Sequence, residues 1–231
     1  MHGGSVGLSG AINLRIGRAG TLTATPAKEL SLLEIARHGL PWRGNSAEVN
    51  KWRLKNFPHL WRGLWRMLVS RMFALPFFYG QLSLVIVRKD GSTLDYGLAS
   101  LRQVTDVGVG FIVDAFQNIV ELEIMKFHGI GTGGAAEGAG NTALTTELTT
   151  QYNPDNTRAT GTTIEGATAN IYRTVGTNTV DAVVAITEHG IFSVATSGSG
   201  VLLDRTLFSA VNLASGDSLQ STYDLTFTAG S

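Results

Sequence analysis

The sequence predicts a mainly β protein, in which an antiparallel β-sandwich or jelly-roll-like module over residues 80–231 follows a basic, partly helical or flexible extension over residues 1–79. Three observations support this fold. Residues 219–227 alternate apolar and polar side chains, as in a strand with one buried face. Turn-forming residues recur at near-regular intervals between residues 176 and 217, as in sandwiches and barrels. A basic helical pattern precedes the first strand signal.

Composition narrows the class of protein. The 231 residues are 43% hydrophobic and 16% charged, and they include no cysteine. The apolar share is enough for a core, and the charged share is below the usual quarter. The lack of cysteine excludes a disulfide framework and thiolate metal sites. No run reaches the roughly 18 apolar residues of a membrane span, and we expect no secretion signal.

A net charge of zero hides an asymmetry between the two parts of the chain. Residues 1–100 contain 13 Lys and Arg against 5 Asp and Glu, whereas residues 101–231 contain 5 against 13. We therefore expect the two parts to make different contacts.

Residues 1–78, in the basic part of the chain, show patterns of a flexible tail and of helices rather than of strands. Residues 1–27 are rich in small residues and predict a flexible tail. Residues 30–39 have helical spacing that ends at Gly39. Residues 56–78 predict a basic amphipathic helix, because apolar side chains recur at three- and four-residue intervals beside arginines. Its apolar positions are Leu60, Trp61, Leu64, Trp65, Leu68 and Met72, and its arginines are Arg62, Arg66 and Arg71.

Several roles remain open for the helix at 56–78. It packs on its own domain, lies on a membrane surface, enters a partner's groove, or contacts nucleic acid through arginine and stacked tryptophan. Basic charge alone does not identify a nucleic-acid reader, and we expect neither nucleic-acid nor membrane binding. Met67 and Met72 are candidate initiation sites, so residues 1–66 are alternatively an extension that the fold does not need.

The first strong β signal is a hairpin over residues 81–98, with its turn at Lys89–Gly91. Beyond it, Thr105 or Asp106 caps a short helix over 107–117. The apolar face expected for this helix comprises Val109, Ile112, Val113 and Phe116. A strand over 121–131, a flexible glycine loop over 131–141, one helical turn over 142–150 and a turn-rich segment over 151–157 follow.

The rest of the chain predicts a run of strands. We expect them at about 158–165, 169–176, 180–188, 190–195, 201–209 and 218–228. The turns between them fall at Gly176–Asn178, Glu188–Gly190, Ser197–Gly200 and Ser215–Asp217.

The glycines from Gly129 to Gly134 satisfy the G-x-G-x-x-G pattern of dinucleotide-binding proteins. That site needs a helix directly after the glycines, inside a βαβ unit. Here the following residues are poor helix formers, and the downstream pattern is antiparallel β. We expect no cofactor, and interpret the segment as a loop that flexes or passes close to a neighbouring subunit.

Other candidate chemistry is sparse. Glu188 and His189 are expected at a strand end, where they stabilise a turn or make an interface contact, because no nucleophile elbow or HExxH motif accompanies them. His128 has no partner at metal-ligand spacing. The oxygens of Asn153, Asp155, Asn156, Asp204 and Asp217 suit calcium, but their spacing is not that of an EF-hand and Asx turns explain them equally well. We expect no enzyme and no metal site.

A series of short motifs carries a resemblance to a known class of protein. In order they are HGIGTGG, TALTTELT, TRATGT, NIYRTVGTNTVDAVVAITEHGIFS and GVLLDRTLFSAVNLASGDSLQSTYDLTFT. Over about residues 100–230 this order resembles tailed-bacteriophage virion structural proteins. The resemblance does not extend to residues 1–75.

The resemblance implies a non-enzymatic protein present in many copies on the phage particle, and in the host cytoplasm before assembly. It implies capsid cement or decoration, binding the major capsid protein or other virion proteins, or else a tail-fibre or collar component. A host- or glycan-binding adhesin using Tyr152, Tyr172 and Tyr223 is the rival from another class. We expect a homo-oligomer without a small-molecule substrate. The candidate interface residues are Gly131, Gly133, Gly134, Glu188, His189, Trp61 and Trp65.

Overall fold

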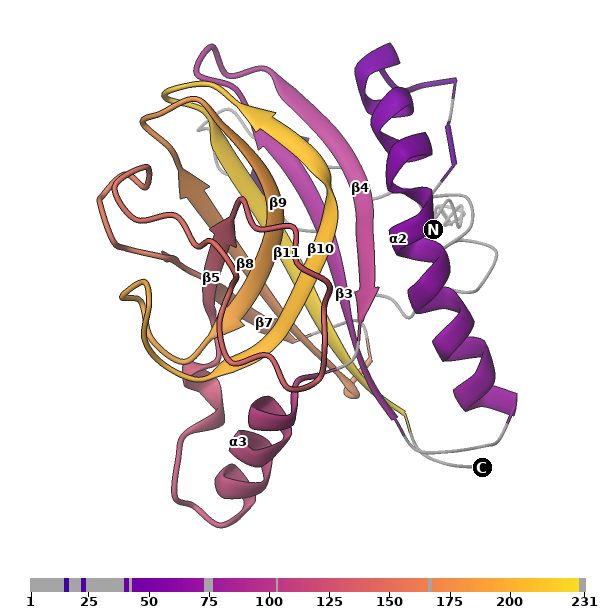
Figure 1. The fold of residues 1–231 in the computed structure, drawn as a ribbon, viewed down its shortest axis with the longest axis vertical. Coiled ribbons are helices and arrows are strands. Elements are labelled where there is room, and N and C mark those ends of the chain that lie inside the picture. The colour runs from indigo at the N-terminus through magenta and orange to yellow at the C-terminus, as the bar shows by residue number, and fades with distance from the viewer. Residues whose placement is uncertain are drawn as a thin grey trace, which may run out of the picture.

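In the computed structural model, two antiparallel sheets face each other and a long helix precedes them, which confirms the predicted mainly β class (Figure 1). The structure describes residues 15–16, 22–23, 40–41, 43–72, 77–102, 104–165 and 168–228. The helix predicted at 30–39 and most of the predicted 1–27 tail lie outside these residues. Within the tail, β1 (Arg15–Ile16) and β2 (Leu22–Thr23) form a separate antiparallel pair.

The two main sheets have four and five strands. The four-stranded sheet has the order β10-β9-β5-β6, and the five-stranded sheet has the order β4-β3-β11-β8-β7. The strands are β3 (Phe77–Val87), β4 (Thr93–Arg102), β5 (Phe127–Gly131), β6 (Ala159–Thr160), β7 (Thr162–Glu165), β8 (Ile171–Thr179), β9 (Val184–Phe192), β10 (Leu202–Leu213) and β11 (Ser218–Thr228). The helices are α2 (Ala47–Met72), α3 (Asp106–Phe116) and the 3-10 turn η1 (Leu122–Ile124).

The main hydrophobic core lies between the two sheets. Leu84 and Leu219 from the five-stranded sheet pack in one cluster with Ile130 and Ile186 from the four-stranded sheet. All four side chains are fully buried. Burial of this kind contributes roughly 1.5–3 kcal/mol for each large aliphatic side chain, so packing between the sheets stabilises the fold.

Several predicted strands are confirmed. β3 and β4 form the expected hairpin, which turns through Gly91 at a φ of 82°. β11 spans the predicted residues 218–228, but its polar face is not wet, because Gln220, Asp224 and Thr226 are buried. On that face Asp224 accepts two hydrogen bonds from Arg173 of β8, at 2.6 and 2.8 Å.

Several predictions in the back half are wrong, and one of them is the turn expected at Gly176–Asn178, which lies inside β8. The strand expected over 121–131 begins only at Phe127, because η1 occupies residues 122–124. Residues 142–150 form turns and an isolated bridge rather than a helical turn. The turn expected at Glu188–Gly190 is absent, because β9 runs without interruption from 184 to 192 and pairs with both β5 and β10.

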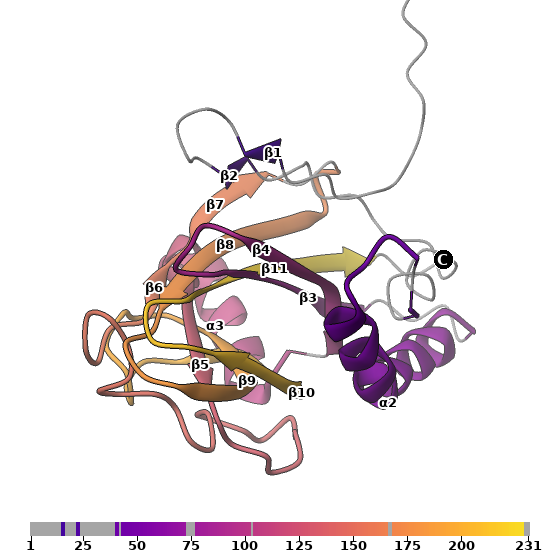
Figure 2. The same cartoon turned by 90° about the horizontal axis from the view of Figure 1, so that it is seen from above.

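Helix α2 closes the open side of the sandwich between β4 and β10 (Figure 2). Each of these edge strands carries a bulge there, at Ala99 and around Ser209, which leaves backbone groups outside the ladders. Asn56 of α2 bonds to both: its Nδ2 donates to Ala99 O at 2.7 Å, and its Oδ1 accepts from Ser209 N at 2.8 Å. Trp52 Nε1 donates to Ser209 O at 2.7 Å. The helix therefore satisfies the polar groups that the two bulges expose.

The predicted boundaries of this helix are wrong, and its predicted apolar stripe is only partly buried, because Leu60 and Leu64 pack in a core cluster. The helix begins at Ala47 rather than 56 and ends at Met72, and residues 77–78 belong to β3. Its inward face includes Trp52, Asn56, Leu60 and Met67, whereas Trp61 and Trp65 are 52% and 58% exposed. The spacing of apolar residues does not show which face of the helix is buried, because polar Asn56 faces inward and aromatic Trp61 faces outward.

Helix α3 begins with the predicted cap, because Thr105 Oγ1 accepts from Gly108 N at 3.0 Å. The same hydroxyl donates to Leu202 O of β10 at 2.7 Å and so ties the helix to the sheet. The predicted face is again largely wrong. Gly108, Phe111 and Ile112 are buried, whereas Val109, Val113 and Phe116 are exposed.

Replacing Asn56 with alanine tests whether α2 is part of the folded unit. Asn56→Ala leaves the buried carbonyl of Ala99 and the partly buried amide of Ser209 without partners, which is expected to lower the free energy of unfolding by about 2–4 kcal/mol in urea titrations. Met72→Ala, at the exposed last residue of the same helix, is the matched control and is expected to change it by less than about 0.5 kcal/mol. Equal midpoints for the two variants would show that α2 does not stabilise the sandwich.

Candidate interaction surfaces

The segment between β5 and β6 is organised around the carboxylate of Glu188. Glu188 lies in the middle of β9 with 0% of its surface exposed. Its Oε1 accepts from Gly133 N at 3.0 Å and Thr146 N at 2.7 Å, and its Oε2 accepts from Thr145 N at 3.0 Å. One buried carboxylate therefore holds both ends of the loop 132–147, hereafter the anchored loop.

Arg205 of β10 forms an ion pair with this carboxylate and donates further hydrogen bonds to the loop. Its Nε and Nη2 lie 2.9 and 2.8 Å from Glu188 Oε2, and both side chains are almost fully buried. The remaining guanidinium hydrogens are donated to the loop itself, to the carbonyl oxygens of Ala135 and Ala136, to Asn141 Oδ1 and to Thr145 Oγ1. A buried ion pair of this kind is strongly destabilised when one partner is lost, because the other charge stays in the interior.

Two glycines allow the loop to approach the carboxylate. A Cβ at Gly133 would overlap Glu188 Oε1 and the side chain of Thr145. A Cβ at Gly131 would overlap Thr146 O and Glu188 Oε1. Gly134 has open space around it and is exposed. The glycine pattern at 131–133 is thus explained by close backbone approach, a standard use of glycine.

A second ion pair fixes the neighbouring loop. Arg158 donates from Nε and Nη2 to Glu147 at 2.5 and 2.8 Å, and its guanidinium carbon lies 3.5 Å from the ring centre of Phe192. Arg158 also donates to Ser199 O at 2.8 Å, and Glu147 Oε2 accepts from Gly198 N at 3.0 Å. The turn at 196–200 is therefore tied to the end of the anchored loop.

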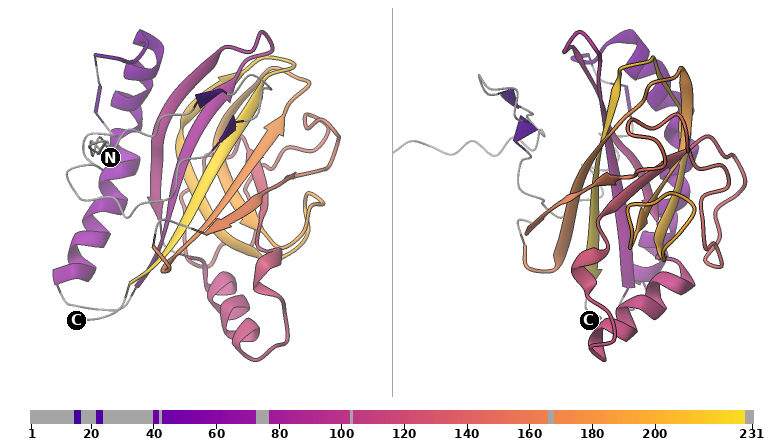
Figure 3. Two further views of the ribbon diagram at one scale, coloured as in Figure 1. Left: turned by 180° about the vertical axis from the view of Figure 1, so that it is seen from behind. Right: turned by 90° about the vertical axis from the view of Figure 1, so that its left-hand side faces the viewer.

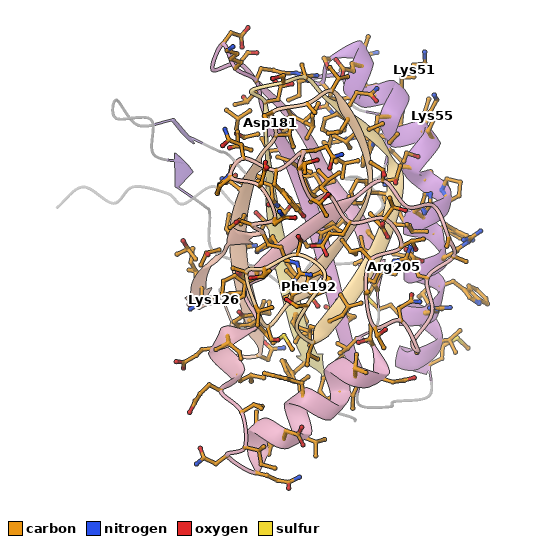
Figure 4. The ribbon with its side chains drawn as sticks, turned by 60° about the vertical axis from the view of Figure 1, so that its left-hand side comes forward. Lys51, Lys55, Lys126, Asp181, Phe192 and Arg205 are labelled. Carbon is orange, nitrogen blue, oxygen red and sulfur yellow. The ribbon has the colours of Figure 1, made fainter. Side chains whose placement is uncertain are left out.

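These contacts hold the anchored loop, whose exposed side chains are mostly small, in one conformation. Thr132, the residues 134–136 and the residues 138–140 of the anchored loop are exposed. Arg205 and Phe192, labelled in Figure 4, are buried beneath these loops, where Arg205 donates to the carbonyl oxygens of the anchored loop and Phe192 packs against Leu144. A loop with its anchors buried and its small side chains outside suits protein–protein contact, because little conformational entropy remains to be lost on binding.

A pair of neutral histidines lies beside this network. His128 Nδ1 and His189 Nε2 are 3.0 Å apart, and His128 Nε2 lies 3.2 Å from Thr174 Oγ1. Burial lowers the pKa of His128 to about 3, and burial together with the charge of His128 lowers the pKa of His189 well below its usual value. Both rings are neutral near pH 7, and one donates to the other.

Asp204 of β10 shows the opposite effect of burial. Its Oδ2 accepts from Tyr223 Oη at 3.0 Å, while its Oδ1 is buried without a hydrogen bond. Burial raises the pKa of Asp204 to about 7, against the opposing effects of the Tyr223 hydroxyl and the positive charge of Arg102. The carboxyl is therefore partly protonated at neutral pH.

The structure divides the sequence-derived candidates into three groups. Gly131, Gly133 and Glu188 come together at the base of the anchored loop, and Gly134 lies on its exposed surface. His189 points to His128 inside the sandwich. Trp61 and Trp65 lie apart from the loop, on the outer face of α2. Sequence reasoning missed Arg205, Arg158 and Glu147, because single charged residues within strands and loops give no signal of their partners.

The structure also places the residues behind the other interpretations of the sequence, and Tyr172, one of the three tyrosines named for an adhesin, is half-buried and donates to Met125 O at 2.8 Å. Tyr152 and Tyr223, named for an adhesin, are buried. Every residue between 131 and 159 is described and none is helical, so the glycine pattern lacks the helix of a dinucleotide site. The described part of the chain contains no cluster of three or more His, Asp or Glu suited to a metal ion. Among the described residues, no helix has the length and apolar character of a membrane span.

Comparisons of the chain with protein-family models, curated proteins and solved structures gave no match.

Removing the charge of Glu188 tests the anchor. Glu188→Gln leaves Arg205 as an uncompensated buried cation, so the free energy of unfolding is expected to fall by about 3–5 kcal/mol. Limited proteolysis is expected to shift to the anchored loop. Asp181→Asn, at an exposed position in the β8–β9 turn, serves as the control and is expected to match the wild type. An unchanged cleavage pattern in Glu188→Gln would contradict the anchoring role.

The buried titratable groups predict a pH dependence of stability. The folded-state pKa of each histidine is depressed, so their contribution is complete above the unfolded pKa of about 6.5 and is lost as the pH falls through the folded pKa, which is about 3 for His128. The pKa of Asp204 is raised, so its contribution is complete below about 3.9 and is lost as the pH rises through about 7. The two effects oppose each other between pH 4 and 6.5.

Removing Asp204 is therefore expected to steepen the loss of stability in acid. In the wild type, the two histidines lower the free energy of unfolding as the pH falls and Asp204 partly offsets them, so the net slope is roughly 1 kcal/mol per pH unit. Asp204→Asn removes the offset and is expected to make this slope about twice as steep. Urea unfolding at a series of pH values measures both slopes. Identical slopes for the two proteins would mean that Asp204 is ionised throughout in the folded state.

Proposed function

We propose that this chain is a non-enzymatic structural protein of a tailed-bacteriophage virion, a cement or decoration protein that binds the capsid through repeated protein–protein contacts. The observation that carries the proposal is the anchored loop, whose exposed residues are held in place by the buried Glu188–Arg205 pair. A protein that stabilises a particle in many copies gains from contact loops that are ordered before binding.

The motifs behind the resemblance coincide with this anchoring network. HGIGTGG supplies Gly131 and Gly133, and TALTTELT supplies Thr145 and Glu147. The remaining charged members come from three later motifs, as Arg158 in TRATGT, Glu188 in AITEHGIF and Arg205 in LLDRT. Residues chosen for their order in the sequence thus contact one another in space. This agreement supports a shared architecture of the loop region, from which the virion role is proposed.

The proposed contact surface consists of the anchored loop and the turn at 196–200. Arg158 and Glu147 tie these two segments together, so they form one continuous surface. Both present small residues, which let backbone groups approach a partner's surface closely. The partner on the particle is the major capsid protein, or another virion protein at the same lattice position.

Adding charge to the loop tests this surface. A Cβ added at Gly134 or at Gly140 would have no other atom within 4 Å, so Gly134→Glu with Gly140→Glu is expected to fold normally. The double variant is expected to bind purified phage heads that lack this protein at least about tenfold more weakly, because two charges are buried unpaired in the contact. Co-sedimentation with the heads measures the binding.

Val183→Glu is the matched control, because it adds a charge at an exposed residue of the β8–β9 turn. It is expected to bind heads like the wild type. Wild-type protein that binds isolated tails but not heads would replace the cement role by a tail or collar role. Binding to neither would contradict the proposal.

A further inference from the structure

Helix α2 presents an aromatic stripe and a basic stripe to solvent, side by side. Leu54, Phe57, Trp61 and Trp65 follow one another at spacings of three and four residues and are all exposed. The second stripe, at spacings of four and seven residues, comprises Lys51, Lys55, Arg62 and Arg66. Figure 4 shows Lys51 and Lys55 pointing away from the sandwich. The single acidic residue of the helix, Glu48, lies 3.5 Å from Arg88 rather than among these cations.

Helix α3 and the segment after it present the complementary surface. Val109, Val113, Phe116, Ile119 and Leu122 are exposed, and Phe116 is 85% exposed. The charged residues between 103 and 125 are all acidic: Asp106, Asp114, Glu121 and Glu123. Of these, Asp106, Glu121 and Glu123 are exposed.

One molecule cannot join its own two surfaces in this fold. Helix α2 runs along β4 and β10, whereas α3 lies at one end of the sandwich, tied to β10 through Thr105 (Figures 1 and 3). The apolar residues of both surfaces are exposed in the single chain. Clusters of exposed aliphatic and aromatic side chains mark interaction sites, and Trp, Phe and Arg are enriched in such contacts.

We infer that the outer face of α2 binds the face formed by α3 and residues 117–123 of a second copy of this chain, head to tail. Trp61 and Trp65 pack against the exposed apolar residues around Phe116, while the cations of α2 meet Glu121 and Glu123. Charge complementarity selects this partner: the basic face repels another α2, and the acidic face repels another α3. Both kinds of like-to-like pairing are thereby disfavoured.

A contact between two different surfaces has a structural consequence. Each copy that binds through α2 leaves its own α3 surface free, so the contact repeats until the copies close into a ring or extend as a chain. Neither surface includes a residue of the anchored loop, although Asp106 N at the start of α3 donates to Ala139 O of that loop at 2.9 Å. The inference deepens the proposed virion role, on which it rests for its biological setting.

Charge reversal on each face, followed by reversal of both, tests the inference. The variants are Lys55→Glu with Arg62→Glu on α2, Glu121→Lys with Glu123→Lys after α3, and all four changes together. Sedimentation velocity over a wide concentration range measures association of the full chain. Each two-site variant is expected to associate at least about tenfold more weakly than the wild type, and the four-site variant is expected to recover wild-type association.

Raising the salt from about 0.1 M to about 1 M is expected to weaken wild-type association, because the Debye length falls from about 10 to about 3 Å.

Lys89→Glu, at the exposed β3–β4 turn, is the control and is expected to associate like the wild type. Urea unfolding midpoints close to that of the wild type establish that the variants fold. A wild-type protein that stays monomeric at all concentrations would overturn the inference, as would a four-site variant that fails to recover. The assay contains no phage particle, so its outcome is separate from the binding of heads that tests the proposed function.

Discussion

The buried pair formed by Glu188 and Arg205 is the interaction on which the functional part of this structure depends. It lies between the two strands β9 and β10, and its remaining hydrogen bonds go to the loop 132–147 rather than to other strands. The pair therefore turns a glycine-rich segment without regular structure into a defined surface. Its burial is costly unless every polar atom is satisfied, which explains why the loop backbone must close over it.

A similar requirement places the N-terminal helix. The bulges in β4 and β10 leave backbone groups unpaired at the open side of the sandwich, and Asn56 and Trp52 of α2 bond to them. This inward role for polar Asn56 leaves the aromatic stripe outside, where it is available for contact with another chain. The same division of faces occurs in α3, whose buried face is narrow because Gly108 lies directly against Leu203 of β10.

The fold class and most strands follow from the sequence, since alternation and turn residues act over short distances. The hairpin 81–98, the cap at Thr105 and the strand 218–228 are examples. Contacts between distant residues do not follow: Arg205 and Glu188 each look like an isolated charge. Both helices reveal the same limit, because the three- and four-residue spacing of Trp61 and Trp65 shows that a stripe exists but not which stripe the sheets cover.

Amide hydrogen exchange tests most directly whether the loop is held by Glu188. If it is, the amides of Gly133, Thr145 and Thr146, which donate to the carboxylate, exchange as slowly as core amides of β9 such as that of Ile186. Exchange at the rate of an unstructured peptide at these three amides, in a protein whose β9 amides stay protected, would contradict the anchoring of the loop by this carboxylate.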